Sequence, residues 1–193
     1  MYICEKHKNM DKKKILLVID VQNDFIDGAL SNEVAKSRIP NIIKKINDFD
    51  GEHILITKDT HNEDYMSTSE GIHLPVPHCI KGTNGWEINK DVMFTIETKK
   101  IPYTIIEKPT FGSWQLTSFI DNFTKTCDNP IELNVIGFCT DICVISNVIM
   151  LKAALFDNPN VEIIVDSNCC AGVTEEKHNA ALEVMKSCQI NII

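Results

Sequence analysis

The chain has 193 residues, of which 44% are hydrophobic and 24% charged, and this composition suits one globular domain with a full core. Its formal net charge of -8 argues against nucleic acid or an anionic membrane as the main partner. The basic residues are nearly all lysine, with Arg38 the only arginine. The chain therefore has few side chains that could bind a phosphate group in bidentate fashion. No apolar run approaches the length of a membrane span.

The amino-terminal segment and the cysteines bear on the compartment. Residues 1–13 are strongly charged and lack the apolar stretch of a secretory signal, so we expect a flexible leader there. The eight cysteines are dispersed along the chain, and without a secretory signal most of them should be reduced thiols. No C-x-x-C pair occurs, which argues against the usual structural zinc site and the thioredoxin-type motif. A cytoplasmic protein is therefore predicted.

Apolar runs and helical patterns alternate along the chain. Continuous Ile- and Val-rich runs are typical of strands buried on both faces of a parallel sheet; they occupy 15–19, 53–57, 103–107, 131–137 and 161–165, with a short last one at 189–193. Helical periodicity covers 40–49, 113–125, 141–157 and 174–188. Repeated βα units predict a doubly wound α/β fold, with a mostly parallel six-stranded sheet and helices on both faces. We expect it to form a single domain over 14–193.

One segment interrupts this alternation. Residues 58–92 form a long polar excursion that contains Gly, Pro and several histidines. Loops of this length in compact domains are usually functional or disordered. Because the excursion leaves the carboxyl end of a strand, we expect it to border the crevice where parallel strands end.

Three reactive side chains follow the expected strand ends. Asp20 and Lys108 come directly after the first and third apolar runs, and Cys143 lies where the fourth run passes into a helix. Such positions converge on one crevice of a parallel sheet, and the first turn of a helix favours a thiolate. Asp20 would accept the thiol proton, Lys108 would favour the thiolate, and Cys143 would attack a carbonyl carbon. Backbone N–H groups of the turn would stabilise the oxyanion. The pattern predicts a cysteine hydrolase.

Each member of this trio also has an ordinary interpretation. Asp20 could cap the turn after its strand, Lys108 could be a solvated strand-end lysine, and Cys143 could be inert packing. The combination at three matching strand ends is the stronger signal, because nothing structural requires all three.

A second group of side chains has metal-ligand chemistry. Asp59 and His61 alternate at a strand end, and Glu70, His73 and His78 follow in the polar excursion. Carboxylate and imidazole ligands suit zinc, manganese or iron. The spacing matches no tight motif, so a polar loop with scattered histidines remains the alternative on these residues alone.

Taken together, these residues resemble the isochorismatase-like cysteine hydrolases and, within them, the nicotinamidase branch. The resemblance covers nearly the whole chain from residue 14. Its landmarks are Ile19–Phe25, Thr57–His61, His78–Thr83, Lys108–Ser113 and Gly137–Val144, with Asp166–Asn168 and Glu176–Leu182 in the tail.

The resemblance implies an Asp20–Lys108–Cys143 catalytic triad. It also implies a cis peptide bond between Phe138 and Cys139 and an oxyanion hole made by the amides of Cys139 and Cys143. A divalent metal ion, zinc first and manganese or iron as alternatives, would contact the ring nitrogen of a small amide substrate. The resemblance further implies a homo-oligomer. The implied metal ligands are Asp59, His61 and His78, with Glu70 as a fourth.

The chain departs from the nicotinamidase pattern at the substrate ring. Nicotinamidases usually carry an aromatic residue just ahead of a Pro-Pro-His segment, whereas Leu74–His78 has none and is one residue longer. Phe25 matches the other aromatic wall of the substrate site, and Trp86 or Trp114 would have to replace the missing ring. Ring stacking contributes on the order of 1 kcal/mol, so nicotinamide would bind more weakly, or another amide would be the substrate.

The function implied is hydrolysis of a small amide through a thioester, with nicotinamide converted to nicotinate and ammonia as the first expectation. One alternative is a metal-free relative, an isochorismatase-type ether hydrolase or a carbamoyl-amide hydrolase. Another is a catalytically silent binding subunit. A thiol-redox role for Cys139 and Cys143, or for Cys169 and Cys170, is disfavoured because these pairs lack redox-motif spacing.

Overall fold

The computed structural model describes residues 11–193, so most of the predicted leader, residues 1–13, lies outside the described residues; Lys13 already begins the first strand. The elements in chain order are β1 (Lys13–Ile19), α1 (Asn23–Ile26), α2 (Glu33–Asp48), β2 (His53–Asp59), η1 (Tyr65–Ser67), α3 (Ser69–His73), α4 (Lys90–Thr98), β3 (Tyr103–Lys108), α5 (Trp114–Thr126), β4 (Ile131–Phe138), η2 (Thr140–Val144), α6 (Ile145–Ala154), β5 (Val161–Ala171), α7 (Glu175–Ser187) and β6 (Asn191–Ile192).

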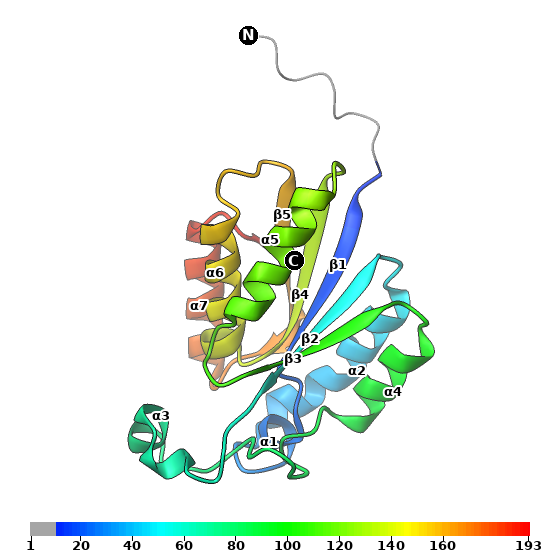
Figure 1. Cartoon of the computed structure of the whole chain (residues 1–193). Helices are drawn as coiled ribbons and strands as arrows, with labels where there is room; N and C mark the ends of the chain where they lie inside the picture. The colour runs from blue at the N-terminus through cyan, green and yellow to red at the C-terminus, as the bar shows by residue number, and fades with distance from the viewer. Residues whose placement is uncertain (1–10) are drawn as a thin grey trace.

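The six strands form one sheet in the order β3-β2-β1-β4-β5-β6. Every strand pairing in it is parallel. Helices α5, α6 and α7 cover one face of the sheet, and α2 and α4 cover the other (Figure 1). The predicted doubly wound α/β fold is therefore confirmed, with a sheet that is entirely parallel.

The core is split into two apolar layers by the alternation of side chains along the strands. On β1, Leu17 packs into the layer under α5, α6 and α7, whereas Leu16 and Val18 pack into the layer under α2 and α4. All three are fully buried. This explains why the strand reads as an uninterrupted apolar run: both of its faces are covered.

Helices α2 and α4 differ clearly from the sequence prediction. Helix α2 begins seven residues before the predicted start at 40, because Asn32 caps it by accepting hydrogen bonds from the amides of Val34 and Ala35; Pro40 is accommodated at an exposed position inside the helix. Helix α4 was not predicted. It lies at the end of the polar excursion, begins at the Asn89 cap and buries two apolar side chains, Val92 and Ile96.

The junction between β4 and the following helix needs a glycine. Gly137 has φ +127, and a Cβ at this position would lie 2.0 Å from the carbonyl oxygen of Ile19 on the neighbouring strand. Only glycine allows β1 and β4 to approach so closely in this conformation. The approach brings the end of β1 next to the turn that carries Cys143.

The described part of the chain contains no helix that is long and apolar enough to cross a membrane. All seven cysteines of residues 11–193 are free thiols, in agreement with the expectation of reduced cysteines. Cys169 and Cys170 lie in opposite apolar layers of the core, as adjacent residues of a strand must.

Candidate active site

Asp20, Lys108 and Cys143 meet at the carboxyl ends of the strands. The Lys108 ammonium lies 2.7 Å from Asp20 Oδ2 and 3.5 Å from Cys143 Sγ. All three side chains are almost completely buried, with exposed fractions of 0, 1 and 5% for Asp20, Lys108 and Cys143. The geometry brings the three side chains together, as the sequence predicts, and the Lys108 ammonium contacts both the carboxylate and the thiol.

Burial shifts the pKa values of this cluster. It raises the pKa of the Cys143 thiol well above its usual range; the Asp20 carboxylate raises it further, and the Lys108 ammonium opposes both. Burial also raises the pKa of Asp20 against the opposing effect of Lys108. Burial therefore opposes the thiolate that the sequence predicts, whereas the Lys108 ammonium favours it, and burial makes the Asp20 carboxylate more basic.

Asp20 is held in an unusual backbone conformation. Its φ is 47°, a left-handed value that is uncommon for a residue other than glycine. Thr57 fixes it there, since the Thr57 hydroxyl donates to Asp20 Oδ1 at 2.6 Å and accepts from the Asp20 amide at 3.2 Å. Strained residues that are over-determined by their surroundings cluster at functional sites. Sequence reasoning did not identify Thr57, although it stands at the end of an adjacent apolar run.

Cys143 lies in η2, a single π-helical turn, and not in the first turn of an α-helix as predicted. The amides of Ile142 and Val144 both donate to the Cys139 carbonyl, at 3.1 and 3.0 Å. The peptide bond between Phe138 and Cys139 is cis, as the resemblance implied. Helix α6 continues from this turn at Ile145 and ends at Ala154, three residues before the predicted end.

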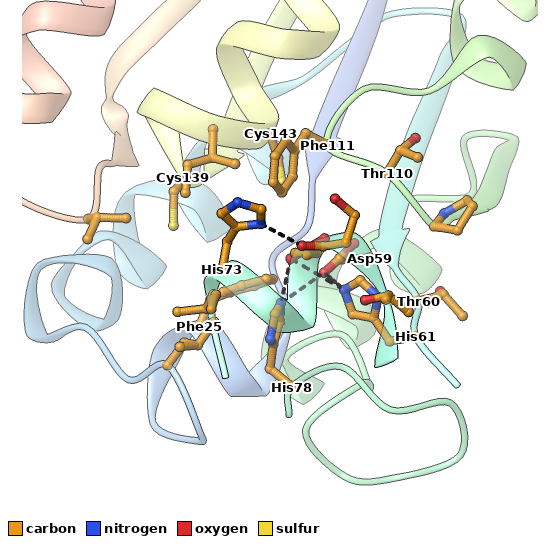
Figure 2. A pocket seen from close by; sticks show the side chains of 18 of the residues that line it. Phe25, Asp59, Thr60, His61, His73, His78, Thr110, Phe111, Cys139 and Cys143 are labelled. Carbon is orange, nitrogen blue, oxygen red and sulfur yellow. Dashed lines mark hydrogen bonds and ion pairs between the residues drawn. The ribbon is translucent and has the colours of Figure 1, made fainter. Parts of the chain in front are cut away.

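A compact group of ligand-type side chains lies beside the triad. One ligand atom from each of Asp59, His61 and His78 lies within 4.8 Å of the others. Asp59 Oδ2 is 3.0 Å from His61 Nε2 and 3.4 Å from His78 Nε2. Glu70 Oε1 is 3.8 and 3.5 Å from the same two nitrogens. Figure 2 shows Asp59, His61 and His78 directed toward one another.

The donor set and its surroundings fit a divalent metal ion. Burial raises the pKa of Asp59, but the neighbouring His61, His78 and Lys108 outweigh it and hold this pKa below its ordinary value, so the carboxylate is ionised. His78 Nδ1 is 2.9 Å from the Val76 carbonyl, which places the proton on Nδ1 and leaves Nε2 free to ligate. Two imidazoles with one or two carboxylates are suitable zinc ligands.

Two residues that sequence reasoning did not single out support this group. Gln22, fully buried, accepts from the Asp59 amide at 2.7 Å and donates to the Asp59 carbonyl at 2.8 Å. Asp24 accepts from the Cys79 amide at 2.7 Å and so anchors the residue after His78. Both lie in the Ile19–Phe25 segment that carries the family resemblance.

Of the triad, Cys143 lines a cavity of about 900 Å³ that Asp59, His61 and His78 also line. Phe25 lines its wall, as expected, and Phe111 and His73 add two further rings. In Figure 2 the His73 ring extends from α3 toward the space that Phe25 and Phe111 also face. Its Nδ1 is 2.8 Å from the Ser69 carbonyl.

Neither tryptophan replaces the missing ring. The Lys58 ammonium lies 3.0 Å from the centroid of the Trp86 ring, and Trp86 Nε1 donates to Thr60 at 2.9 Å. Trp114 is 76% exposed at the start of α5. The two residues do not line the cavity, whereas Phe111 does. In the sequence, Phe111 lies in Lys108–Ser113, one of the segments that carry the family resemblance.

Helix α7 holds the η2 turn through a histidine, which gives a pH-dependent prediction. His178 Nδ1 is 2.8 Å from the Thr140 hydroxyl, and burial lowers the pKa of His178. Because the pKa of His178 is lower in the folded state than in the unfolded state, the unfolded state binds more protons once the pH falls below about 6.5. The free energy of unfolding should therefore fall as pH falls through 6.5. His178→Asn, which can still bond Thr140, should flatten this fall in urea titrations between pH 7.5 and 5.5; an unchanged slope would contradict the assignment.

Comparison with known proteins identifies the class. The isochorismatase domain model matches residues 14–193, and the chain therefore belongs to the isochorismatase family. It is a hydrolase of the isochorismatase type. Among curated relatives, the nicotinamidase/pyrazinamidase of Mycobacterium tuberculosis is 25% identical and aligns with 93% of this chain and 98% of its own. A protein of Arabidopsis thaliana named a probable inactive nicotinamidase is 31% identical over 89% of this chain and 87% of its own.

Solved structures agree with this family. The nicotinamidase/pyrazinamidase of Bacillus subtilis superimposes with a TM-score of 0.75 at 26% identity, over 93% of this chain and 98% of that one. The pyrazinamidase of Pyrococcus horikoshii, solved in complex with zinc, gives a TM-score of 0.72 at 24% identity, over 94% and 98% of the two chains.

Proposed function

We propose that this enzyme hydrolyses a small heteroaromatic carboxamide, nicotinamide first, to the carboxylate and ammonia through a thioester on Cys143. The observation that carries the proposal is that the Cys143 thiol, with Lys108 and Asp20 behind it, and the Asp59–His61–His78 group lie in the same cavity. The nucleophile is thus close to a site suited to hold the ring of its substrate.

In the first half-reaction, Asp20 takes the proton of the Cys143 thiol, and Sγ attacks the amide carbon. The Lys108 ammonium stabilises the thiolate as it forms. The amides of Cys139 and Cys143 are the proposed donors to the tetrahedral oxyanion. Asp20 then returns the proton to the leaving nitrogen, the carbon–nitrogen bond breaks, and ammonia departs.

In the second half-reaction, Asp20 takes a proton from a water molecule, which attacks the thioester. The carbon–sulfur bond breaks, and Asp20 returns the proton to Cys143. The acid so formed loses its proton to solvent, and the carboxylate product leaves a regenerated thiol. The raised pKa of Asp20 suits it to accept a proton and give it back at neutral pH.

The proposed metal ligands are Asp59, His61 and His78, with Glu70 as a fourth, and zinc is the first candidate. A bound ion would act as a Lewis acid toward the ring nitrogen of the substrate and fix its orientation. The chain's own contribution is to hold the ligands rigidly, since Gln22 and the Val76 carbonyl fix Asp59 and His78.

The walls of the cavity should recognise a flat ring. Phe111→Ala is expected to raise KM for nicotinamide about twofold to tenfold with kcat changed less, since one aromatic contact contributes about 0.5–1.5 kcal/mol. Steady-state kinetics would show this, and Trp114→Ala, which removes an exposed ring nearby in the sequence, is the matched control. Equal effects of the two substitutions would argue against a ring wall at Phe111.

The rival functions lead to different results. A metal-free ether or carbamoyl-amide hydrolase would not need the Asp59–His61–His78 group, and a silent binding subunit would not need an Asp20–Lys108–Cys143 cluster. A redox role for Cys139 has little support from the raised pKa of its thiol, about 12 as a result of burial. A cytoplasmic homo-oligomer remains part of the proposal.

The experiment is ammonia release from nicotinamide by the purified protein, with metal content measured on the same sample. Chelation should abolish turnover, and zinc, manganese or iron(II) should then be tested for its recovery. Asp59→Asn should lose both metal and turnover, whereas Glu63→Gln, an exposed acid of the same loop, should lose neither. Metal without turnover would move the substrate to another amide; turnover without metal would favour the metal-free relatives.

A further inference from the structure

A fully buried amide side chain lies one helical turn after the nucleophile. Asn147, in the first turn of α6, has no exposed surface. Its Nδ2 donates to the carbonyl of Cys143 at 2.8 Å and to the carbonyl of Phe111 at 3.2 Å. Its Oδ1 accepts from the amide of Ser113 at 2.9 Å. One side chain therefore joins the main chain of Cys143 to two residues of a different segment.

These three partners determine the orientation of the amide. Both Nδ2 protons are donated to carbonyls, and Oδ1 accepts from an N–H group. In the flipped amide, Oδ1 would face carbonyl oxygens and Nδ2 would face an N–H donor, so all three hydrogen bonds would be lost. Because the group is buried, each lost partner would leave a polar atom unsatisfied. The hydrogen bonds of Asn147 are therefore satisfied in only one position of the Phe111–Ser113 segment relative to Cys143.

The segment that Asn147 holds carries Lys108 and Phe111. The Lys108 ammonium donates to the Thr110 carbonyl at 3.1 Å. A Cβ on Gly112 would lie 2.3 Å from Met150 Sδ, so this loop packs directly against α6. The loop ends at Ser113, which caps α5 by accepting from the Leu116 amide.

We propose that Asn147 is a positioning residue that sets the distance between the Lys108 ammonium and the Cys143 thiol and holds the Phe111 ring at the cavity wall. The link runs from the Cys143 carbonyl through one amide to the loop between β3 and α5. Its effect on turnover rests on the proposed function, whereas its effect on the reactivity of Cys143 does not.

Three variants test the proposal. Asn147→Ala removes every contact. Asn147→Thr can still donate to the carbonyl four residues earlier, as Thr117 does to Ser113 in this chain, but it cannot reach the loop. Asn134→Ala is the matched control, because Asn134 is a buried amide of β4 that bonds to Glu132, away from the site. Each variant is assayed for nicotinamide kinetics and, at the peptide level by mass spectrometry, for the rate of alkylation of Cys143 by iodoacetamide.

For Asn147→Ala we expect kcat to fall by about tenfold to a hundredfold, as misplacement of about 1 Å can cause, KM to rise severalfold, and Cys143 alkylation to slow about tenfold. Asn147→Thr should fold and still show the raised KM, and Asn134→Ala should stay within twofold of the parent throughout. Parent-like kcat, KM and alkylation in Asn147→Thr would overturn the proposal, and so would equal losses in Asn134→Ala. If the parent does not turn over nicotinamide, the proposed function fails and the alkylation rates alone decide.

Discussion

Replacing Cys143 by alanine is expected to lower ammonia release by at least about 10⁴-fold, because removal of a covalent nucleophile leaves only binding and oxyanion stabilisation. The substitution removes one sulfur atom from a side chain that is 5% exposed, so the free energy of unfolding should change little. Turnover, thermal melting and metal content measured on the same preparation would separate loss of chemistry from loss of structure.

The matched control for this prediction is Cys170→Ala. Cys170 is also a buried thiol of the same apolar layer, with no exposed surface, but it lies on β5 away from the cavity. Its removal should preserve turnover. A Cys143→Ala variant that still releases ammonia at a rate near the parent's would eliminate the proposed nucleophile.

Replacing Lys108 by methionine should both inactivate and destabilise the protein. The buried Asp20 carboxylate would lose its partner at 2.7 Å, and breaking a buried ion pair from one side costs about 3 kcal/mol or more. Turnover should fall by at least about 10²-fold because the thiolate loses its cation. Urea titration and nicotinamide kinetics on the same variant would show the two effects.

The pH dependence of this loss has a definite sign. Burial raises the pKa of Asp20 and Lys108 opposes it, so the variant raises this pKa further. The folded state then binds a proton that the unfolded chain releases above about pH 4. Its free energy of unfolding should therefore fall as pH rises from that point, and the deficit against the parent should be smaller at pH 5 than at pH 8.

A double variant separates charge burial from catalysis. Asp20→Asn with Lys108→Met removes both charges, and asparagine tolerates the left-handed backbone of position 20. We expect most of the lost stability to return while turnover stays abolished, since replacing both ions of a buried pair is often close to neutral. A double variant no more stable than Lys108→Met would show that the ion pair is not the source of the loss.

Local signals in the sequence were sufficient to predict the overall fold and the meeting of Asp20, Lys108 and Cys143 at one sheet edge. Uninterrupted Ile- and Val-rich runs identify strands covered on both faces, and a parallel sheet brings Asp20, Lys108 and Cys143 to one edge whatever the details of packing. The metal-type group needed the family resemblance, because Asp59 and His78 are joined by an irregular loop whose conformation depends on contacts with Gln22 and Asp24.

The remaining features arise from tertiary contacts that no local pattern encodes. Helix α2 extends past Pro40 because its cap at Asn32 and its packing on the sheet outweigh one missing hydrogen bond. Burial of Cys143 raises the pKa of its thiol, against the effect expected of a helix start. Nothing in the local sequence around Asn147 indicates its role, because its hydrogen bonds go to the loop that ends at Ser113.

Membership of the family does not by itself establish turnover, since one relative is named a probable inactive nicotinamidase. The most direct test of the proposed thioester mechanism is therefore to mix the enzyme with nicotinamide, quench within the first turnover, and search the peptides by mass spectrometry for a nicotinoyl group. We predict a thioester adduct on Cys143, formed together with ammonia and absent from Cys143→Ala. Ammonia release with no adduct on Cys143, or with an adduct on another residue, would contradict the proposed mechanism.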